Sequence, residues 1–363
     1  MMILTVLLRA GRLLIAAASL HCMLCVGDDD ACSSVYSLPP EYLGYTYEVL
    51  MWPPGSGHSD EALFSVVSST SASTRVRVRL APGPFDCVIM FGASVRLYCG
   101  QTVDFTLVGV ENATFTSTTT DLSGTLVEAS MPVAVYVSNL NVAIGPSNIT
   151  DSTREQLFPV SAWGREFVVT PVPDNNRSGY SIRMSCARAE HVSVTVSGQI
   201  YQITRQRPLT VDFSDNRPAY VSVVNGSDIQ LVQFVRGATT STDGGAPAAL
   251  VLPAVDRYSV EYSVTSIAGY VHYVSVATHR SDVSGLRLNG QPLNLPQSAW
   301  LIVDGPSDWV TTSVLLPAAS TSTLSHTGPR PFAAYSYAYI SRRCAIANPA
   351  GASLPVQVLH SLV

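Results

Sequence analysis

The sequence contains no lysine. All 21 basic residues are arginines, they stand against 26 acidic residues, and the formal net charge is −5. Without lysine the chain can form no lysine Schiff base, and it has no lysine to bind phosphate in a P-loop. A net negative chain also lacks the basic face on which nucleic-acid binding usually depends, so we expect no nucleic-acid partner.

Charge of either sign and catalytic motifs are also scarce. Charged residues make up 13% of the 363 residues and hydrophobic residues 47%, whereas the usual charged share is about 25%. The sequence has no Gly-x-Ser-x-Gly elbow, no His-Glu-x-x-His motif and no phosphate-binding glycine loop. The chain therefore has enough apolar material for a large core, and we expect neither an enzyme nor a cofactor.

The first 27 residues have the features of a secretory signal peptide. Arg9 and Arg12 precede an apolar stretch over residues 13–27, which is shorter than the roughly 20 residues that a transmembrane helix needs. Cys25 and Gly27 are small enough to flank a cleavage site. We expect a secreted protein with no membrane span after signal removal; an uncleaved signal anchor that tethers it to a membrane is the alternative.

Cysteines and glycosylation sequons fit an extracellular chain. Cys87 and Cys99 flank a short apolar run that can fold as a hairpin, so we expect a disulfide between them. Cys32 and Cys344 could join the two ends of the mature chain, whereas Cys186 lies in an alternating segment and is expected to be a buried free thiol; the pairing of these three stays open. Sequons mark four candidate glycosylation sites: Asn112, Asn148, Asn176 and Asn225.

Apolar and polar residues alternate along most of the chain, for example over residues 192–196 and 271–276. Because successive side chains of a strand point to opposite faces, this alternation predicts strands with one buried face and one solvent-exposed face. Turn residues recur about every 8 to 12 positions, which is typical of packed antiparallel sheets. The sequence therefore predicts an all-β protein.

Three segments of the chain begin alike. The openings cover residues 38–49, 158–169 and 252–264, and in each a proline precedes an aromatic residue and a strand. Their prolines lie 120 and 94 residues apart, which is the size of a sandwich domain and not of a solenoid repeat. After the signal segment 1–27 we expect three tandem related β-sandwich-like units followed by a C-terminal tail, with these ranges: 33–142, 150–240, 247–345 and 346–363.

Two strings of the sequence resemble the N-terminal, IgGFc-binding domain of the IgG Fc-binding protein family. They are residues 121–135, which include Asp-Leu-Ser-Gly and Pro-Val-Ala-Val, and residues 155–169, which include Glu-Gln-Leu and Trp-Gly. Residues 284–290 and 332–340 follow in the family's order, so the resemblance covers roughly residues 60–345. The resemblance implies a secreted, non-enzymatic binding domain, which within the family is credited with binding the Fc part of immunoglobulin G.

The charge pattern that stands out is Arg-Val-Arg-Val-Arg-Leu at residues 75–80. In a strand, Arg75, Arg77 and Arg79 share one face and the apolar residues share the other. One interpretation is a solvated face or an edge that is charged to prevent strand addition. The other is a patch that binds acidic glycans or carboxylates, which arginine can hold through two parallel hydrogen bonds.

Other singular residues favour structural roles. Trp163, Tyr258 and Tyr262 belong to the repeated openings, and we expect them to pack in the core. His272 and His279 are seven positions apart near one strand, so they should lie on opposite faces and make a poor metal pair. We therefore expect no metal site.

The leading hypothesis is a secreted, non-enzymatic binding or adhesion protein that recognises an extracellular protein or a glycan through loops and edges of its units. Immunoglobulin Fc enters as a partner only through the family resemblance. A carbohydrate-active hydrolase is an alternative, and it would need two carboxylates about 5–10 Å apart in a cleft. A structural spacer of a mucus or surface matrix is the other alternative.

Overall fold

The computed structural model describes residues 21–23, 34–55, 60–84, 87–92, 94–174, 178–237, 245–306, 308–340 and 344–351. This part of the chain consists of β-strands, five short 3₁₀ turns and connecting loops, which confirms the all-β class. None of its helices is long and apolar enough to cross a membrane. Most of the expected signal segment, together with Cys32, Asn176 and residues 352–363, lies outside the described residues.

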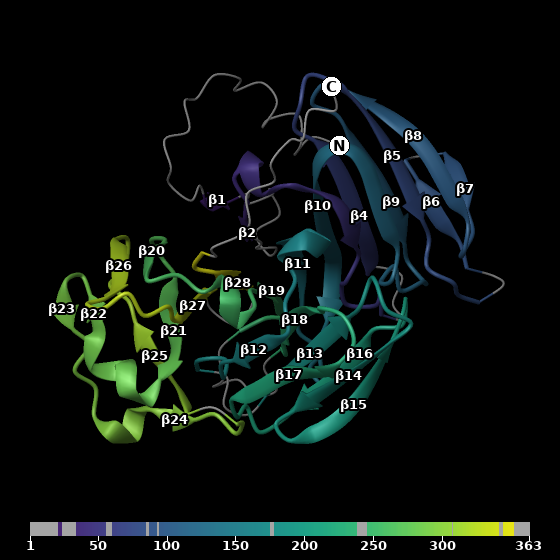
Figure 1. The fold of residues 1–363 in the computed structure, drawn as a ribbon. Coiled ribbons are helices and arrows are strands. Elements are labelled where there is room, and N and C mark those ends of the chain that lie inside the picture. Colours follow the sequence, from purple (N-terminus) through teal and green to yellow (C-terminus); the bar gives the residue numbers. More distant parts are fainter. Residues whose placement is uncertain are drawn as a thin grey trace, which may run out of the picture.

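A nine-stranded antiparallel sheet occupies the first part of the chain (Figure 1). A short pair, β1 (His21–Met23) and β2 (Ser34–Tyr36), precedes it, and η1 (Pro40–Tyr42) leads into its first strand. Its strands are β3 (Gly44–Glu48), β4 (Glu61–Ser68), β5 (Ser73–Arg79), β6 (Ile89–Phe91), β7 (Val95–Leu97), β8 (Thr102–Val108), β9 (Asn112–Ser117), β10 (Leu126–Ala143) and β11 (Thr150–Gln156).

The long strand β10 divides this sheet into two layers. Its first part pairs with β3 and β5, its second part pairs with β4 and β11, and the register shifts between Glu128 and Val133. Pro132 lies in that interval. Proline has no N–H to donate, but no described strand pairs with β10 at this position, so no hydrogen bond of the sheet is lost. The two layers therefore share the bent strand β10. Their strand orders are β8-β5-β10-β3 and β7-β6-β9-β4-β10-β11.

Two further pairs of sheets follow. The second pair begins after η2 (Val160–Ala162), and its sheets have the orders β12-β17-β14-β15 and β16-β13-β18-β19. Its strands are β12 (Glu166–Val169), β13 (Tyr180–Ser185), β14 (His191–Val196), β15 (Gln199–Thr204), β16 (Leu209–Phe213), β17 (Ala219–Asn225), β18 (Gln230–Val235) and β19 (Ala248–Leu252).

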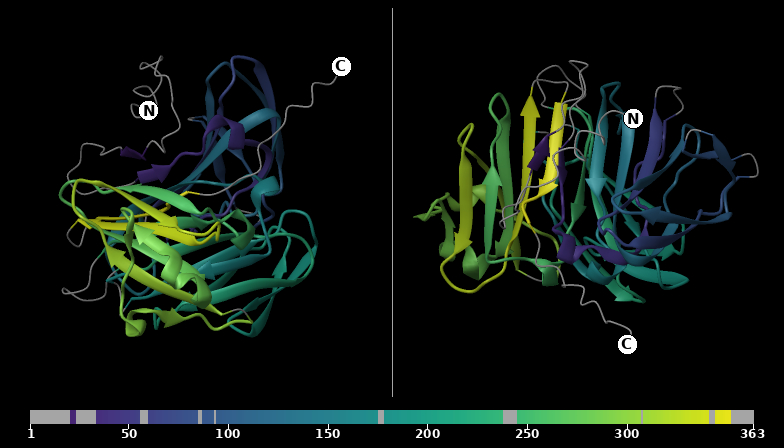
Figure 2. Two further views of the ribbon diagram at one scale, coloured as in Figure 1. Left: turned by 60° about the vertical axis from the view of Figure 1, so that its left-hand side comes forward. Right: turned by 90° about the horizontal axis from the view of Figure 1, so that it is seen from above.

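The third pair begins after η3 (Val255–Arg257), with the orders β20-β26-β22-β23 and β24-β25-β21-β27-β28. Its elements are β20 (Glu261–Thr265), β21 (Val271–His279), η4 (Arg280–Gly285), β22 (Leu286–Leu288), β23 (Gln291–Pro292), η5 (Gln297–Ala299), β24 (Leu301–Ile302), β25 (Trp309–Leu315), β26 (Thr321–His326), β27 (Ala333–Ile340) and β28 (Cys344–Pro349). Seen from above, this third part and the first part lie on opposite sides of the molecule (Figure 2).

The three openings have the same local structure. Each begins with a 3₁₀ turn, and a buried aromatic residue stands five positions after the end of the turn: Tyr47, Phe167 and Tyr262. The hydroxyl of Tyr47 accepts a hydrogen bond from the residue three positions earlier and donates one to the Val133 carbonyl. The hydroxyl of Tyr262 does the same, with Phe332 as its acceptor.

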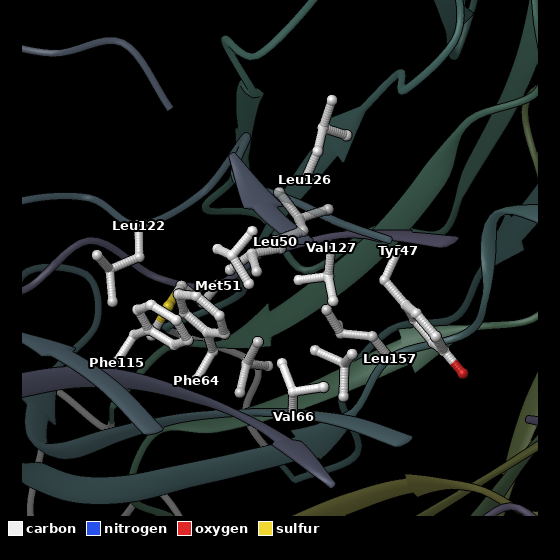
Figure 3. Packing of buried hydrophobic residues seen from close by; sticks show 14 of the residues in the cluster. Tyr47, Leu50, Met51, Phe64, Val66, Phe115, Leu122, Leu126, Val127 and Leu157 are labelled. Carbon is white, nitrogen blue, oxygen red and sulfur yellow. The ribbon is translucent and has the colours of Figure 1, made fainter. Parts of the chain in front are cut away.

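Hydrophobic cores fill the space between the layers. Tyr47, Phe64 and Phe115 are fully buried in the first core, where the two phenylalanine rings stack 4.6 Å apart (Figure 3). The expected core positions of Trp163, Tyr258 and Tyr262 are confirmed, because each is at most 4% exposed. Trp163 packs in the first core, Tyr258 in the second and Tyr262 in the third, so the chain passes from one core to the next at these openings.

The cores continue across the boundaries between the sheet pairs. Phe234 of β18 packs in the first core, where its ring lies 5.1 Å from that of Trp52. Buried tyrosines of β27 join the second and third pairs, since Tyr335 donates to the Val168 carbonyl and Tyr337 donates to Gln233. The three pairs therefore share buried contacts across both boundaries.

Candidate functional site

The three arginines lie on the outward side of β5, between β8 and β10. Their side chains are exposed, whereas the valines between them are buried, as the alternation predicts. On β8, Thr106 is the register partner of Arg75 and Asp104 that of Arg77. On β10, Glu128 is opposite Arg77. We name this surface the arginine face and define it by Arg75, Arg77, Arg79, Asp104, Thr106, Glu128 and Ser130.

Two of the three arginines are paired with carboxylates. The Nε of Arg77 lies 2.8 Å from Oδ1 of Asp104, and a second, longer bond of 3.4 Å joins Nη2 to Oδ2. This bond and the charge of Asp104 raise the pKa of the Arg77 guanidinium. Arg79 lies 4.0 Å from Glu128. Because these side chains are about half exposed, the pairs contribute little to stability, but they neutralise most of the expected basic patch.

Arg75 is different, because its guanidinium has no ion-pair partner among the described residues. Its backbone N–H donates to the Ser130 hydroxyl at 2.9 Å. Arg75 lines a groove of about 590 Å³ together with Arg77, Asp104, Thr106, Glu128 and Ser130. With Arg79 at its margin, this face has three positive and two negative side chains, so its net charge is +1.

A smaller cleft of about 340 Å³ lies between the second and third sheet pairs, and it is lined by Ser197, Tyr220, Asp304 and Gly305, among others. The Tyr220 ring is 3% exposed, so it offers no platform on which a sugar could stack. In addition, Gly305 lies so close to this ring that a Cβ there would be 2.8 Å from it. We therefore regard the arginine face as the stronger candidate.

A buried carboxyl lies between the first and second sheet pairs. Glu48 is 0% exposed, and no described residue lies in good hydrogen-bond geometry to either of its carboxyl oxygens. Burial raises the pKa of Glu48 to about 7, although the nearby Ser185 hydroxyl and the positive charge of Arg205 oppose the shift. Burial likewise raises the pKa of Glu155, whose Oε2 accepts a bond from the Val251 N–H. Neither groove contains these two carboxyls.

The structure contains the disulfide between Cys87 and Cys99, whose Cα atoms are 5.9 Å apart. Cys186 is a buried free thiol. Since Cys32 lies outside the described residues, its pairing with Cys344 stays a prediction. The side chains of three sequon asparagines are exposed, and they are Asn112, Asn148 and Asn225.

Among the described residues, no three histidine, cysteine, aspartate or glutamate side chains are grouped so that they could hold a metal ion. His272 is buried, and its Nε2 accepts a bond from the Ile267 N–H. This part of the chain therefore offers no group of candidate ligands for a metal ion.

Sequence reasoning missed Asp104, Glu128 and Ser130 as parts of the arginine face. Asp104 follows the same alternation as the exposed threonines of its strand, so its outward direction was readable. The position of Asp104 opposite Arg77 could not be predicted. These two residues are 27 positions apart, and the register between their strands is set by the connecting segment and by the core.

The fold and this surface define an all-β, disulfide-containing protein with an open, charged groove on one of its sheets. The family model described as "IgGFc binding protein" matches residues 33–338, and the chain belongs to this family. The human "IgGFc-binding protein" is 29% identical over 275 residues, which are 74% of this chain and 5% of the human protein. The chain therefore spans a small fraction of that relative's length.

Proposed function

We propose that this chain is a secreted, non-enzymatic binding protein whose arginine face binds an anionic group on an extracellular protein or an acidic glycan. The observation that carries the proposal is Arg75, which has no ion-pair partner in the described part of the chain and lies in a groove that otherwise balances its charges. Arginine can hold a carboxylate or a sulfate through two parallel hydrogen bonds. The disulfide between Cys87 and Cys99 supports secretion, because such bonds persist in oxidising compartments.

We further propose that the molecule consists of three tandem related β-sandwich units. The corresponding strand orders of the three sheet pairs and the shared geometry of their openings support this arrangement. Strand pairing supports closing the first unit after β11 and the second after β19, since these strands pair with β10 and β18. We therefore propose boundaries that lie one strand later than those expected from the sequence.

The groove offers little support for a hydrolase. Its two carboxylates, Asp104 and Glu128, are 62% and 51% exposed and lie beside Arg77 and Arg79. A glycosidase needs one carboxylic acid that stays protonated near neutral pH, and a protected environment normally provides it. We therefore prefer binding to catalysis.

The test compares Arg75→Glu with Arg330→Glu, a matched control that makes the same charge change at an exposed arginine of another sheet pair. The probes are a heparin column and immobilised IgG Fc, the latter because of the name of the human relative. We expect Arg75→Glu to leave the column at lower salt than wild type and to lose at least tenfold in Fc affinity if Fc is the ligand. Equal behaviour of both variants and wild type on both probes would refute a role of the arginine face.

A further inference from the structure

β8 forms an edge of its layer. It pairs with β5 on one side and with no described strand on the other, and it lies at the rim of the molecule in Figure 1. At seven residues it is longer than β15 and β23, the last strands in the corresponding sheets of the other two pairs. An edge of this length presents a row of backbone donors and acceptors.

The register decides which backbone groups of β8 point outward. The N–H of Leu80 donates to the carbonyl of Gln101 at 2.9 Å, and from that pair every second residue of β8 is bonded to β5. The backbone N–H and C=O groups of the intervening residues therefore point away from β5. These residues are Thr102, Asp104, Thr106 and Val108.

Two hydrogen bonds agree with this assignment. The N–H of Arg75, the register partner of Thr106, turns to Ser130 of β10 and not to β8. The N–H of Val108 donates to Oε2 of Glu111 at 2.8 Å, so it points out of the ladder. The carboxylate of Glu111 thus already accepts from the N–H of Val108, the last donor of the edge. No described residue forms a hydrogen bond with the outward backbone groups of Asp104 and Thr106.

β8 lacks the features that usually prevent strand addition. Natural edges carry lysine, proline or a bulge, or they are very short. β8 has no lysine or proline, and its pairing with β5 is unbroken over all seven residues. Its one charge, on Asp104, is held by Arg77. The backbone of β8 is therefore open to a further strand.

Arg75 lies within reach of such a strand. Neighbouring strands are about 4.8 Å apart, so a strand added to β8 would run about 10 Å from β5. The intervening side chain is the short Thr106, which lines the groove together with Arg75. The long Arg75 side chain can therefore extend over Thr106 to a carboxylate on the added strand. Two residues further along the same face of β8, Val108 is 62% exposed and can contact an apolar side chain.

We propose that β8 is a docking edge for an extended segment of a partner protein, which adds to the sheet as a further strand. The segment carries an aspartate or glutamate that faces Arg75 and, two positions away on the same face, an apolar residue that packs on Val108. Backbone hydrogen bonds provide affinity, and these two side chains provide specificity. This inference rests on the proposed function and narrows its ligand to a protein segment.

The test selects a displayed library of random nine-residue peptides on the purified, full-length protein. Enriched peptides should alternate strand-forming and polar residues and carry an acidic and an apolar residue two positions apart. Synthetic versions are then measured against Thr106→Pro, which removes an outward N–H while leaving the bonds to β5 in place. Thr106→Val keeps that N–H and is the matched control, and thermal unfolding shows whether both variants are folded.

We expect Thr106→Pro and Arg75→Gln each to weaken peptide binding about tenfold or more, and Thr106→Val to leave it nearly unchanged. Equal affinity of folded Thr106→Pro and wild type would overturn the docking edge, as would a library that yields no acidic, alternating peptide. Heparin binding distinguishes the proposed anion binding from the proposed strand addition. If Arg75→Glu releases heparin and Thr106→Pro has no effect on any ligand, anion binding stands and strand addition is wrong.

Discussion

Replacing Glu48 with glutamine should stabilise the protein at neutral pH. The carboxyl is fully buried beside Ser185 and Arg205, and among the described residues none makes a well-formed hydrogen bond to its two oxygens. Its pKa in the folded protein is about 7, against 4.5 for an ordinary glutamate. Because the folded state holds the proton more tightly than the unfolded state, stability is greatest below the unfolded value and falls as pH rises to about 7.

The size of the effect follows from the shift. A pKa difference of one unit corresponds to about 1.4 kcal/mol, so ionised Glu48 lowers the free energy of unfolding by about 3 kcal/mol at pH 8. Glutamine resembles the protonated carboxyl in shape and does not ionise. We therefore expect Glu48→Gln to have nearly wild-type stability at pH 4 and to be about 3 kcal/mol more stable at pH 8.

The assay is urea unfolding of wild type and variant at pH 4 and pH 8, and the quantity of interest is the difference between the two proteins at each pH. Other carboxyls that titrate near pH 4 cancel in that difference, because both proteins contain them. Arg205 and Cys186 are charged or titratable groups that interact with Glu48. A difference that is the same at both pH values would refute the reasoning, since it would show that Glu48 does not change its protonation between them.

Two further substitutions test the packing. Trp163→Ala removes a side chain that is 3% exposed and whose Nε1 donates to the Phe158 carbonyl, so it should cost about 3–5 kcal/mol in urea unfolding; a cost below 1 kcal/mol would contradict a core role. Tyr337→Phe removes the 2.7 Å bond to Gln233 and should cost about 1–3 kcal/mol, because a buried acceptor loses its donor. If unfolding of the Tyr337 variant splits into separate transitions, the sheet pairs are less tightly joined than their shared core indicates.

The all-β class, the disulfide between Cys87 and Cys99 and the outward direction of Arg75 could be predicted from the sequence. Each depends on residues close together in the chain: alternation within a strand, or two cysteines 12 residues apart. The pairing of strands distant in sequence could not be predicted in the same way. The apolar strand β19 lies in the range 247–345 that we expected for the third unit, yet it bonds to β18, because an apolar strand joins whichever open edge lies beside it.

What the sequence by itself determined is the local pattern: which residues of a strand share a face, where the openings recur, and that the chain buries an apolar core. Only the tertiary structure decided which charges meet and which are left over. Asp104 neutralises Arg77 but not Arg75, and Glu48 is enclosed between two sheet pairs. These outcomes depend on register and packing between segments distant in sequence, and the period of a single strand carries no information about them.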